Sequence, residues 1–322
     1  MIKKRHFYIV IGVLLAGFIV GSFLDLQINQ AIYSQGNMFG VIMASFGTYP
    51  CYAGLSFAAG GLLVTSVKKK DLHIIFKILS WGLAALGYGL SVWLGSKDVP
   101  SVNGFNNDAL ELPFTIANIF VFLGFAALGF IVCNKGDENK LWSALMVMAV
   151  IFLLALLPTS FLIKLVLHRP RYRFVVNSGE IAFHNWWESY GAYEEYINEG
   201  HVLYGVTITK EEFKSFPSGH SGSAAIMMMV LPYLSLFFNK LKGKETIMFY
   251  IGFGWTLVMM FSRMLVGAHF LTDTCMGALI VVVVFYIGHE IATRKGFIYK
   301  DEYHSHYMFQ ESYIPDHHVQ IY

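Results

Sequence analysis

Three short clusters of cationic, histidine and acidic residues have types and spacings suited to chemistry on a phosphate group. They are KLVLHRPR at 164–171, PSGH at 217–220 and SRMLVGAHFLTD at 262–273. Each cluster lies where a long apolar run begins or ends. Ionisable groups at such positions of a membrane protein are costly and usually functional. We therefore interpret the three clusters as parts of one site.

The second cluster has the pattern of a helix start. Ser218 is a helix-capping residue, Gly219 lets the backbone approach a ligand, and His220 follows at once. The amino terminus of a helix presents unpaired N–H groups and favours an anion. Taken alone, this sequence would mark only a turn and a cap.

Three cations would place fixed positive charge beside that anion: Lys164, Arg171 and Arg263. The guanidinium groups of arginine match the oxygens of a phosphate in geometry. Singly, Lys164 and Arg263 would also fit cations that anchor a helix end at a membrane interface. The order, spacing and common face of the clusters favour a binding site.

The third cluster supplies a histidine and a carboxylate at helical spacing. His269 and Asp273 are four residues apart, and hence on one face of a helix. A carboxylate bonded to one ring nitrogen fixes the tautomer and leaves the other nitrogen as a nucleophile or base. His220 then remains as a separate acid. The combined residues predict phosphoryl transfer that needs neither a metal nor a cofactor.

The composition identifies the elements that position these residues as membrane-spanning helices. The chain has 322 residues, of which 56% are hydrophobic and 14% charged, against about 25% charged in soluble domains. Its apolar runs approach the roughly 17–25 residues that cross a bilayer, and the short alternating segments of a β-barrel are missing from the sequence. The net charge of +2 gives no indication of a nucleic-acid partner. We expect an all-α, polytopic transmembrane helical bundle within the lipid bilayer.

About eight apolar spans are expected, at 7–24, 39–66, 73–95, 112–133, 141–167, 218–238, 246–265 and 270–292. Lysine and arginine gather in alternate connections, which are the cytoplasmic ones under the positive-inside rule. Both termini are then cytoplasmic and the three clusters lie at the outer face. We expect one transmembrane domain over 1–299 and a polar cytoplasmic tail over 300–322, with no indication of the oligomeric state.

The outer loop at 168–217 is long and rich in aromatic and acidic residues. It contains Trp186, Trp187 and Tyr190 between glutamates. Such a segment fits an aromatic belt at the membrane interface. It also fits a cap over a site that admits a lipid.

The clusters resemble the three signature motifs of the type 2 phosphatidic acid phosphatase family, over about residues 140–292. The second and third motifs match fully. In the first, Lys164 and six further residues lead to Arg171, but Tyr172 stands where the family has proline. Arg171 is therefore the expected phosphate contact and Arg169 the competing one. The family core has six spans, so two spans here are additional.

The resemblance implies a plasma-membrane phosphatase that hydrolyses a phosphate monoester or diphosphate of a membrane lipid at the outer face. His269, held by Asp273, would attack phosphorus and form a phosphohistidine. His220 would protonate the leaving oxygen and later deprotonate water. The phosphoryl oxygens would be held by Lys164, Arg171, Arg263, the Ser218 side chain and the Gly219 N–H group.

The family's range of lipids includes undecaprenyl diphosphate, phosphatidic acid and phosphatidylglycerol phosphate. Two alternatives stay within phosphoryl transfer: a phosphatase of soluble esters and a phosphotransferase with an alcohol acceptor. A transporter or flippase is a distant alternative, since it predicts broken helices and charges near the middle of the spans.

Overall fold

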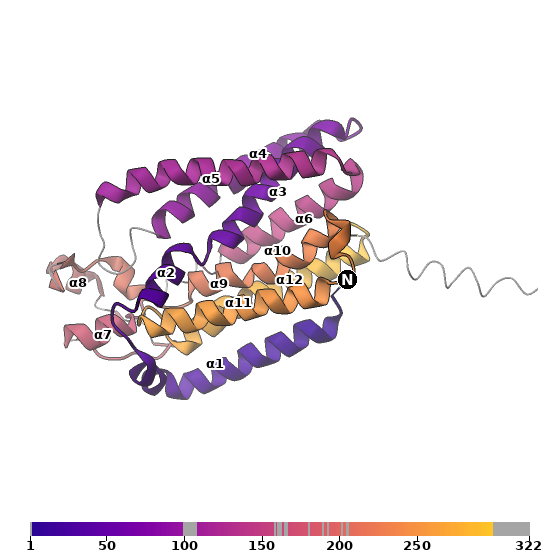
Figure 1. Ribbon diagram of the computed structural model, residues 1–322. Helices are drawn as coiled ribbons and strands as arrows, with labels where there is room; N and C mark the ends of the chain where they lie inside the picture. Colours follow the sequence, from indigo (N-terminus) through magenta and orange to yellow (C-terminus); the bar gives the residue numbers. More distant parts are fainter. Residues whose placement is uncertain are drawn as a thin grey trace, which may run out of the picture.

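Apolar helices make up nearly all of the regular structure in the computed structural model (Figure 1). The structure describes residues 2–98, 108–157, 159, 163, 167–179, 181–188, 190–191, 193–200, 202–203 and 206–298. In chain order the elements are α1 (Lys4–Ile32), α2 (Met38–Phe46), α3 (Tyr49–Lys68), α4 (Ile74–Asp98), α5 (Asp108–Asn134), α6 (Glu138–Leu157), α7 (Tyr172–Ser178), α8 (Tyr193–Asn198), β1 (Val202–Leu203), β2 (Val206–Thr207), η3 (Lys210–Phe213), α9 (Gly219–Ala225), α10 (Met227–Tyr233), η4 (Leu234–Leu236), η5 (Asn239–Leu241), α11 (Glu245–Leu265) and α12 (Leu271–Arg294). β1 and β2 pair as one short antiparallel hairpin. The expected all-α class is confirmed.

Seven helical segments within the described residues are long and apolar enough to cross a membrane. They are α1, the pair α2–α3, α4, α5, α6, α11 and α12. Pro50 in the first turn of α3 marks the start of that helix after α2 has ended at Phe46, because proline suits a first turn and disrupts a helix interior. The expected span at 39–66 is therefore a bent helix pair.

The remaining expected span, at 218–238, is α9, α10 and η4 in succession. Ile226 joins α9 to α10 with helical dihedrals (φ −60°, ψ −24°), so the chain keeps one direction. Two features accompany the irregularity. Pro232 lies inside α10 and lacks an N–H group. A Cβ on Gly252 of α11 would lie 2.6 Å from the backbone of Met227, so α11 packs directly on the backbone here.

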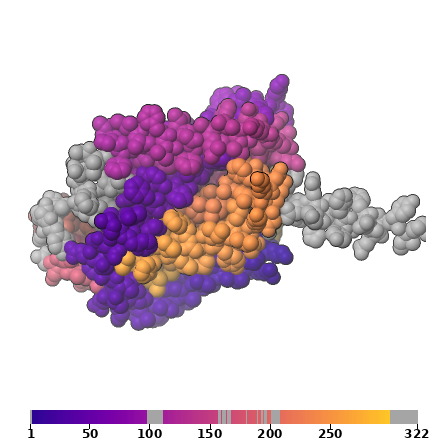
Figure 2. All heavy atoms as spheres, in the orientation of Figure 1, coloured from indigo at the N-terminus to yellow at the C-terminus, as the bar shows by residue number. Residues whose placement is uncertain are grey.

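The outer helices turn large apolar side chains away from the protein. Phe23 on α1 is 77% exposed and Phe120 on α5 is 67% exposed. In Figure 2, α1 lies along one edge of the molecule and α5 along the opposite edge. Apolar surface on this scale is unusual in water and suits contact with hydrocarbon. α3, by contrast, is buried for most of its length.

The two ends of the bundle differ in what they carry. α7 and α8 lie at the end opposite the amino terminus (Figure 1). The carboxyl end of α12 returns to the amino terminus, where Lys4 and Glu290 form an ion pair of 2.9 Å. The start of α12 therefore lies at the end that carries α7 and α8.

Candidate active site

Backbone hydrogen bonds bring the three predicted clusters together at the start of α12. The Ser215 N–H donates to the Arg169 carbonyl (3.1 Å), and the Ser218 N–H donates to the Asp273 carbonyl (2.9 Å). A Cβ on Gly277 would lie 2.2 Å from the Ser218 carbonyl oxygen, so only glycine permits this approach of α12 to the start of α9. The expected convergence of the clusters is thus a feature of the structure.

His269 is buried, and one of its ring nitrogens is bonded to a backbone carbonyl. Nδ1 lies 2.6 Å from the Ser215 carbonyl oxygen. A carbonyl can only accept, so Nδ1 carries the proton in the neutral ring and Nε2 carries the lone pair. The His269 carbonyl accepts from Nδ2 of Asn29 on α1 (3.1 Å). The ring and backbone of His269 are both fixed in place.

Asp273 does not make the hydrogen bond to His269 that we expected from the sequence. Its Oδ2 lies 3.8 Å from Nδ1 of His269, beyond hydrogen-bonding distance. The reason is that this carboxylate has other donors: Ser215 Oγ (2.5 Å) and the Phe270 N–H (2.8 Å) on Oδ2, and Arg169 Nη1 (2.6 Å) on Oδ1. Asp273 thus acts on the ring electrostatically and through Ser215, whose carbonyl holds Nδ1.

Arg169 is fully buried, and its guanidinium is committed within the protein. Nη1 donates to Asp273 and to Thr272 Oγ1 (2.8 Å), Nη2 donates to Asp25 Oδ2 (3.0 Å), and Nε donates to the His184 carbonyl (2.8 Å). The guanidinium also stacks 4.1 Å above the ring of Phe270. These contacts make Arg169 a poor choice for a phosphate contact.

Arg171 has fewer contacts within the protein, although it is only two residues away. Its Nε donates to the Glu211 carbonyl (2.8 Å), and its Nη1 lies 3.5 Å from the carbonyl of Ala268, the residue before His269. Burial and the neighbouring Arg173 lower the pKa of Arg171, but arginine stays protonated in proteins. The geometry favours Arg171 over Arg169 as the phosphate contact.

The start of α9 carries the second cluster as a capped helix. Ser218 is buried, and its Oγ accepts from the Ser221 N–H at 3.3 Å, as a capping serine should. His220 is partly exposed, and its Nε2 lies 3.1 Å from the Ala44 carbonyl of α2. Because that carbonyl accepts, Nε2 carries a proton and Nδ1 is the nitrogen that can exchange one.

The last turn of α11 places Arg263 next to His269. Arg263 is 2% exposed, and its carbonyl accepts from the N–H groups of Ala268 (3.0 Å) and His269 (3.3 Å). Lys164, the remaining predicted cation, lies outside the described residues.

The segment at 181–187 covers the buried Arg169. The His184 carbonyl binds Arg169, and Phe183 lies against the Phe270 ring (5.2 Å between centroids). Trp186 packs on Phe18 of α1 (5.0 Å between centroids), and its Nε1 donates to Ser22 Oγ (3.0 Å). This part of the loop is packed over Arg169 and against α1.

Beside the cover, an ion pair joins the loop to the site. Arg173 and Glu212 form two hydrogen bonds, of 2.5 and 3.1 Å. Burial alone would raise the pKa of the Glu212 carboxyl, but the charge and hydrogen bonds of Arg173 outweigh burial and lower it. The Arg173 N–H donates to the Gly267 carbonyl (2.8 Å), so the pair ties η3 to the turn that precedes His269.

Three further residues contact this site and were not predicted from the sequence: Asp25, Asn29 and Ser215. Asp25 and Asn29 are polar residues near the end of an apolar span, and polar residues at membrane depth are often functional. That signal was in the sequence. Ser215 precedes the second motif, and its contribution through a backbone carbonyl leaves no trace in residue type.

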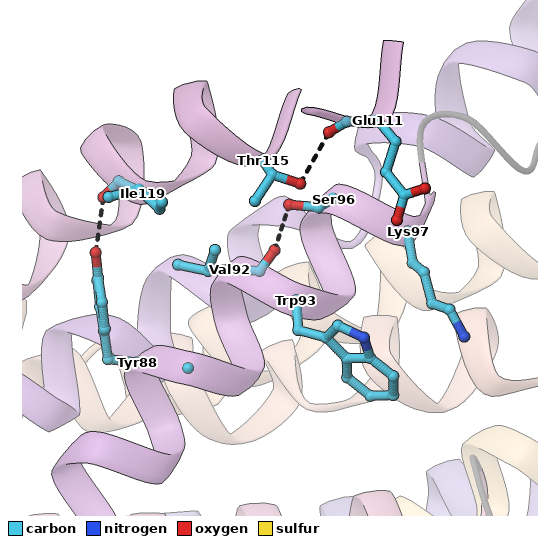
Figure 3. Close-up of a pocket in the computed structure, with 9 residues that line it drawn as sticks. Tyr88, Val92, Trp93, Ser96, Lys97, Glu111, Thr115 and Ile119 are labelled. Atoms are coloured by element: carbon cyan, nitrogen blue, oxygen red, sulfur yellow. Dashed lines mark hydrogen bonds between the residues drawn. The ribbon is translucent and has the colours of Figure 1, made fainter. Parts of the chain in front are cut away.

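A cavity of about 270 Å³ lies elsewhere, between α4 and α5 (Figure 3). Trp93, Lys97 and Glu111 are among its lining residues, and Lys97 Nζ lies 5.0 Å from the centre of the Trp93 ring. None of the predicted site residues lines it. The chemistry of the side chains therefore locates the candidate site better than cavity volume does.

Comparison with known proteins agrees with the site. The model of the PAP2 superfamily matches residues 140–297, which include all three clusters. No curated protein and no solved structure matches the chain. The resemblance drawn from the motifs is confirmed: residues 140–297 are similar to the PAP2 superfamily, and the match supports a phosphatase that acts on phosphate esters.

Proposed function

We propose that the protein hydrolyses a phosphate monoester or diphosphate of a membrane lipid at the outer face of the plasma membrane, with His269 as the nucleophile. The observation that carries this proposal is the 2.6 Å contact between His269 Nδ1 and the Ser215 carbonyl. It fixes the tautomer in which Nε2 holds the lone pair, and an oriented imidazole is a competent nucleophile.

The first step would be in-line attack by Nε2 of His269 on phosphorus. The P–N bond forms as the P–O ester bond breaks, and the leaving oxygen takes its electron pair together with a proton from His220. Arg171, Arg263 and Lys164 would offset the charge on the phosphoryl oxygens, with Ser218 and the Gly219 N–H group. A phosphohistidine results.

The second step would return the enzyme to its starting state. His220 removes a proton from water, the water oxygen attacks phosphorus, and the P–N bond breaks with its electron pair returning to Nε2. The products are inorganic phosphate and an alcohol, or a phosphomonoester from a diphosphate. This chemistry needs no metal, because the fixed cations and N–H groups take over the neutralisation of charge.

Two features support a lipid substrate at the outer face. His269 lies between the end of α11 and the start of α12, two helices long and apolar enough to cross a membrane, and the headgroup of a lipid at the membrane surface would reach such a position. This end of the bundle is opposite the amino terminus (Figure 1), which the positive residues Lys3, Lys4 and Arg5 predict to be cytoplasmic.

Phosphate release by the purified protein in detergent, with EDTA present, tests the proposal. The substrates are undecaprenyl diphosphate, phosphatidic acid and a short soluble phosphate ester, each with the His269→Ala variant beside the wild type. Release from a lipid that survives EDTA and vanishes in the variant is expected. Release only from the soluble ester would reject the lipid substrate, and loss of activity in EDTA would reject the metal-independent mechanism.

A further inference from the structure

A second buried carboxylate, Asp25, reaches the site from outside the region that matches the superfamily. Asp25 lies on α1 and is 3% exposed, whereas the match begins at residue 140. Its Oδ2 accepts from Arg169 Nη2 (3.0 Å) and from the Thr272 hydroxyl, and its Oδ1 accepts from the Thr272 N–H (3.1 Å). Both oxygens are thus directed at groups beside His269.

Arg169 links Asp25 to the carboxylate nearest His269. Its guanidinium lies between Asp25 and Asp273, with one ion pair to each, and all three side chains are almost completely buried. Thr272 completes a closed loop, because its hydroxyl accepts from Arg169 and donates to Asp25. Removing one member of such a buried group leaves the remaining charges buried without an opposite charge beside them, which is strongly destabilising.

Asp25 also acts on the helix that begins beside His269. The first N–H groups of an α-helix have no partner within the helix. Asp273 accepts from the Phe270 N–H within the chain segment itself. Asp25 accepts from the Thr272 N–H across the interface between α1 and α12. One turn further along α1, Asn29 binds the carbonyl of His269.

We propose that Asp25 is a positioning residue for the nucleophile, and that α1 is therefore a working part of the active site. It holds Arg169 against Asp273 and fixes the first turn of α12, which together orient His269 toward phosphorus. The inference rests on the proposed function of His269. It extends the site by a helix that the superfamily match does not include.

The test compares Asp25→Asn with Tyr8→Phe in the full-length protein in detergent. The Tyr8 hydroxyl contacts the Tyr286 hydroxyl (2.8 Å), so Tyr8→Phe removes a polar contact of the same helix pair, α1 and α12, at its other end. Groups that orient a metal-binding histidine are typically worth about 10–100-fold in activity, and we take the same scale for a group that orients a nucleophilic histidine. We expect Asp25→Asn to lower kcat by this factor with KM changed less than about threefold, and Tyr8→Phe to change neither.

A pH profile separates positioning from a general loss of packing. Within the described residues, the charged groups near His269 include Asp273 on α12, Arg169 and Arg171 before α7, Asp25 on α1 and Arg263 on α11. Asp25→Asn removes negative charge from this set and so disfavours the protonated imidazole of His269. The acidic limb of kcat/KM should move to lower pH in Asp25→Asn and stay in place in Asp25→Glu, which keeps the charge. A packing defect would lower the amount of active enzyme without moving the limb.

Hydrogen exchange at the start of α12 keeps the inference testable apart from catalysis. If the wild type releases no phosphate, the proposed function fails, and exchange alone decides the inference. Faster exchange of the amides at 270–275 in Asp25→Asn, but not in Tyr8→Phe, supports it. The inference would be overturned if Asp25→Asn had the same kcat, the same acidic limb of the pH profile and the same amide exchange at 270–275 as the wild type. If Asp25→Asn does not fold, Thr272→Val keeps both charges but removes the shared hydroxyl, and a wild-type kcat in that variant would equally overturn it.

Discussion

Helix α12 has a buried histidine near each end, and the two differ in every partner. His269, just before its start, is bonded to a backbone carbonyl and lies beside an arginine held by two carboxylates. His289, near its end, is bonded to the phenol of Tyr233 (2.9 Å) and lies against the rings of Phe7 and Phe285. Burial of a histidine is therefore no sign of function by itself. The neighbouring charges separate the candidate nucleophile from a histidine that packs.

The largest effect on kcat is expected when each of the two histidines is replaced separately. His269→Ala should lower kcat by about four orders of magnitude or more, because a covalent route has no substitute for its nucleophile. His289→Phe should keep kcat within about threefold, since the ring stays among aromatic neighbours. Steady-state phosphate release measures both. Equal losses in the two variants would remove the distinction drawn between the ends of α12.

The second largest effects are expected from replacing Arg169 and Arg171 near the start of α12, the charged end of that helix, and they differ in kind. Arg171→Ala should lower kcat/KM by about 10²–10³, the usual effect of losing one transition-state contact, with an unchanged thermal midpoint. Arg169→Ala should destabilise the fold by about 3–5 kcal/mol, because Asp25 and Asp273 lose their shared cation. Thermal unfolding in detergent, beside kcat/KM, tests both. A stable Arg169→Ala enzyme with a selective loss of kcat/KM would make Arg169 the phosphate contact instead.

A smaller effect, on stability, is expected near the end of α12, where His289 packs against aromatic rings. Tyr233→Phe removes the hydroxyl that pairs with Nδ1 of His289 and leaves a buried nitrogen without its partner. Such a loss costs about 1–3 kcal/mol. The thermal midpoint should fall while phosphate release per folded molecule stays at the wild-type value. A large loss of turnover would show that this end also affects catalysis.

The smallest effect is a pH-dependent one at the charged end. Because the folded pKa of Glu212 is lowered, its pairing with Arg173 stabilises the fold fully above the unfolded pKa and is lost as pH falls through the folded one. At pH 7, Glu212→Gln should cost about 1 kcal/mol, the scale of a partly exposed ion pair. That difference from wild type should shrink as the pH falls below the ordinary range of a glutamate carboxyl. A Glu212→Gln deficit that stays constant as the pH falls would contradict the assignment.

Much of the site at the start of α12 could be predicted, because its residues are recognisable from their types and their spacing in the sequence. The described parts of the three clusters, at 167–171, 217–220 and 262–273, converge as expected, and the all-helical class follows from long apolar runs. The spacing after Lys164 favoured Arg171 over Arg169 as the phosphate contact, but the reason that Arg169 is unsuitable, its ion pairs with two buried carboxylates, could not be predicted from sequence. The hydrogen bond of His269 escaped prediction for another reason: its acceptor is the main chain of Ser215.

Contacts between residues far apart in the chain could not be predicted from the sequence either. Asp25 contacts Arg169, 144 residues away in the chain, and Thr272, 247 residues away. No local periodicity carries such a pairing. The irregular path from α9 to η4 was also hidden, because the apolar run at 218–238 looks like a regular span although it contains Pro232.

The distance along the chain between Asp25 and its cation has a consequence for biogenesis. Translation at about 5–20 residues per second means that Asp25 is made roughly 7–30 s before Arg169, which follows 144 residues later. During that interval α1 has a carboxylate near the bilayer and no arginine to pair with it, a state that costs about 2.5–3.5 kcal/mol at the centre of a membrane and less near its edge. The hydrogen bonds from Thr272 come later still, with the last long helix. Asp25 on α1 thus acquires its full set of partners only after α12 has been made.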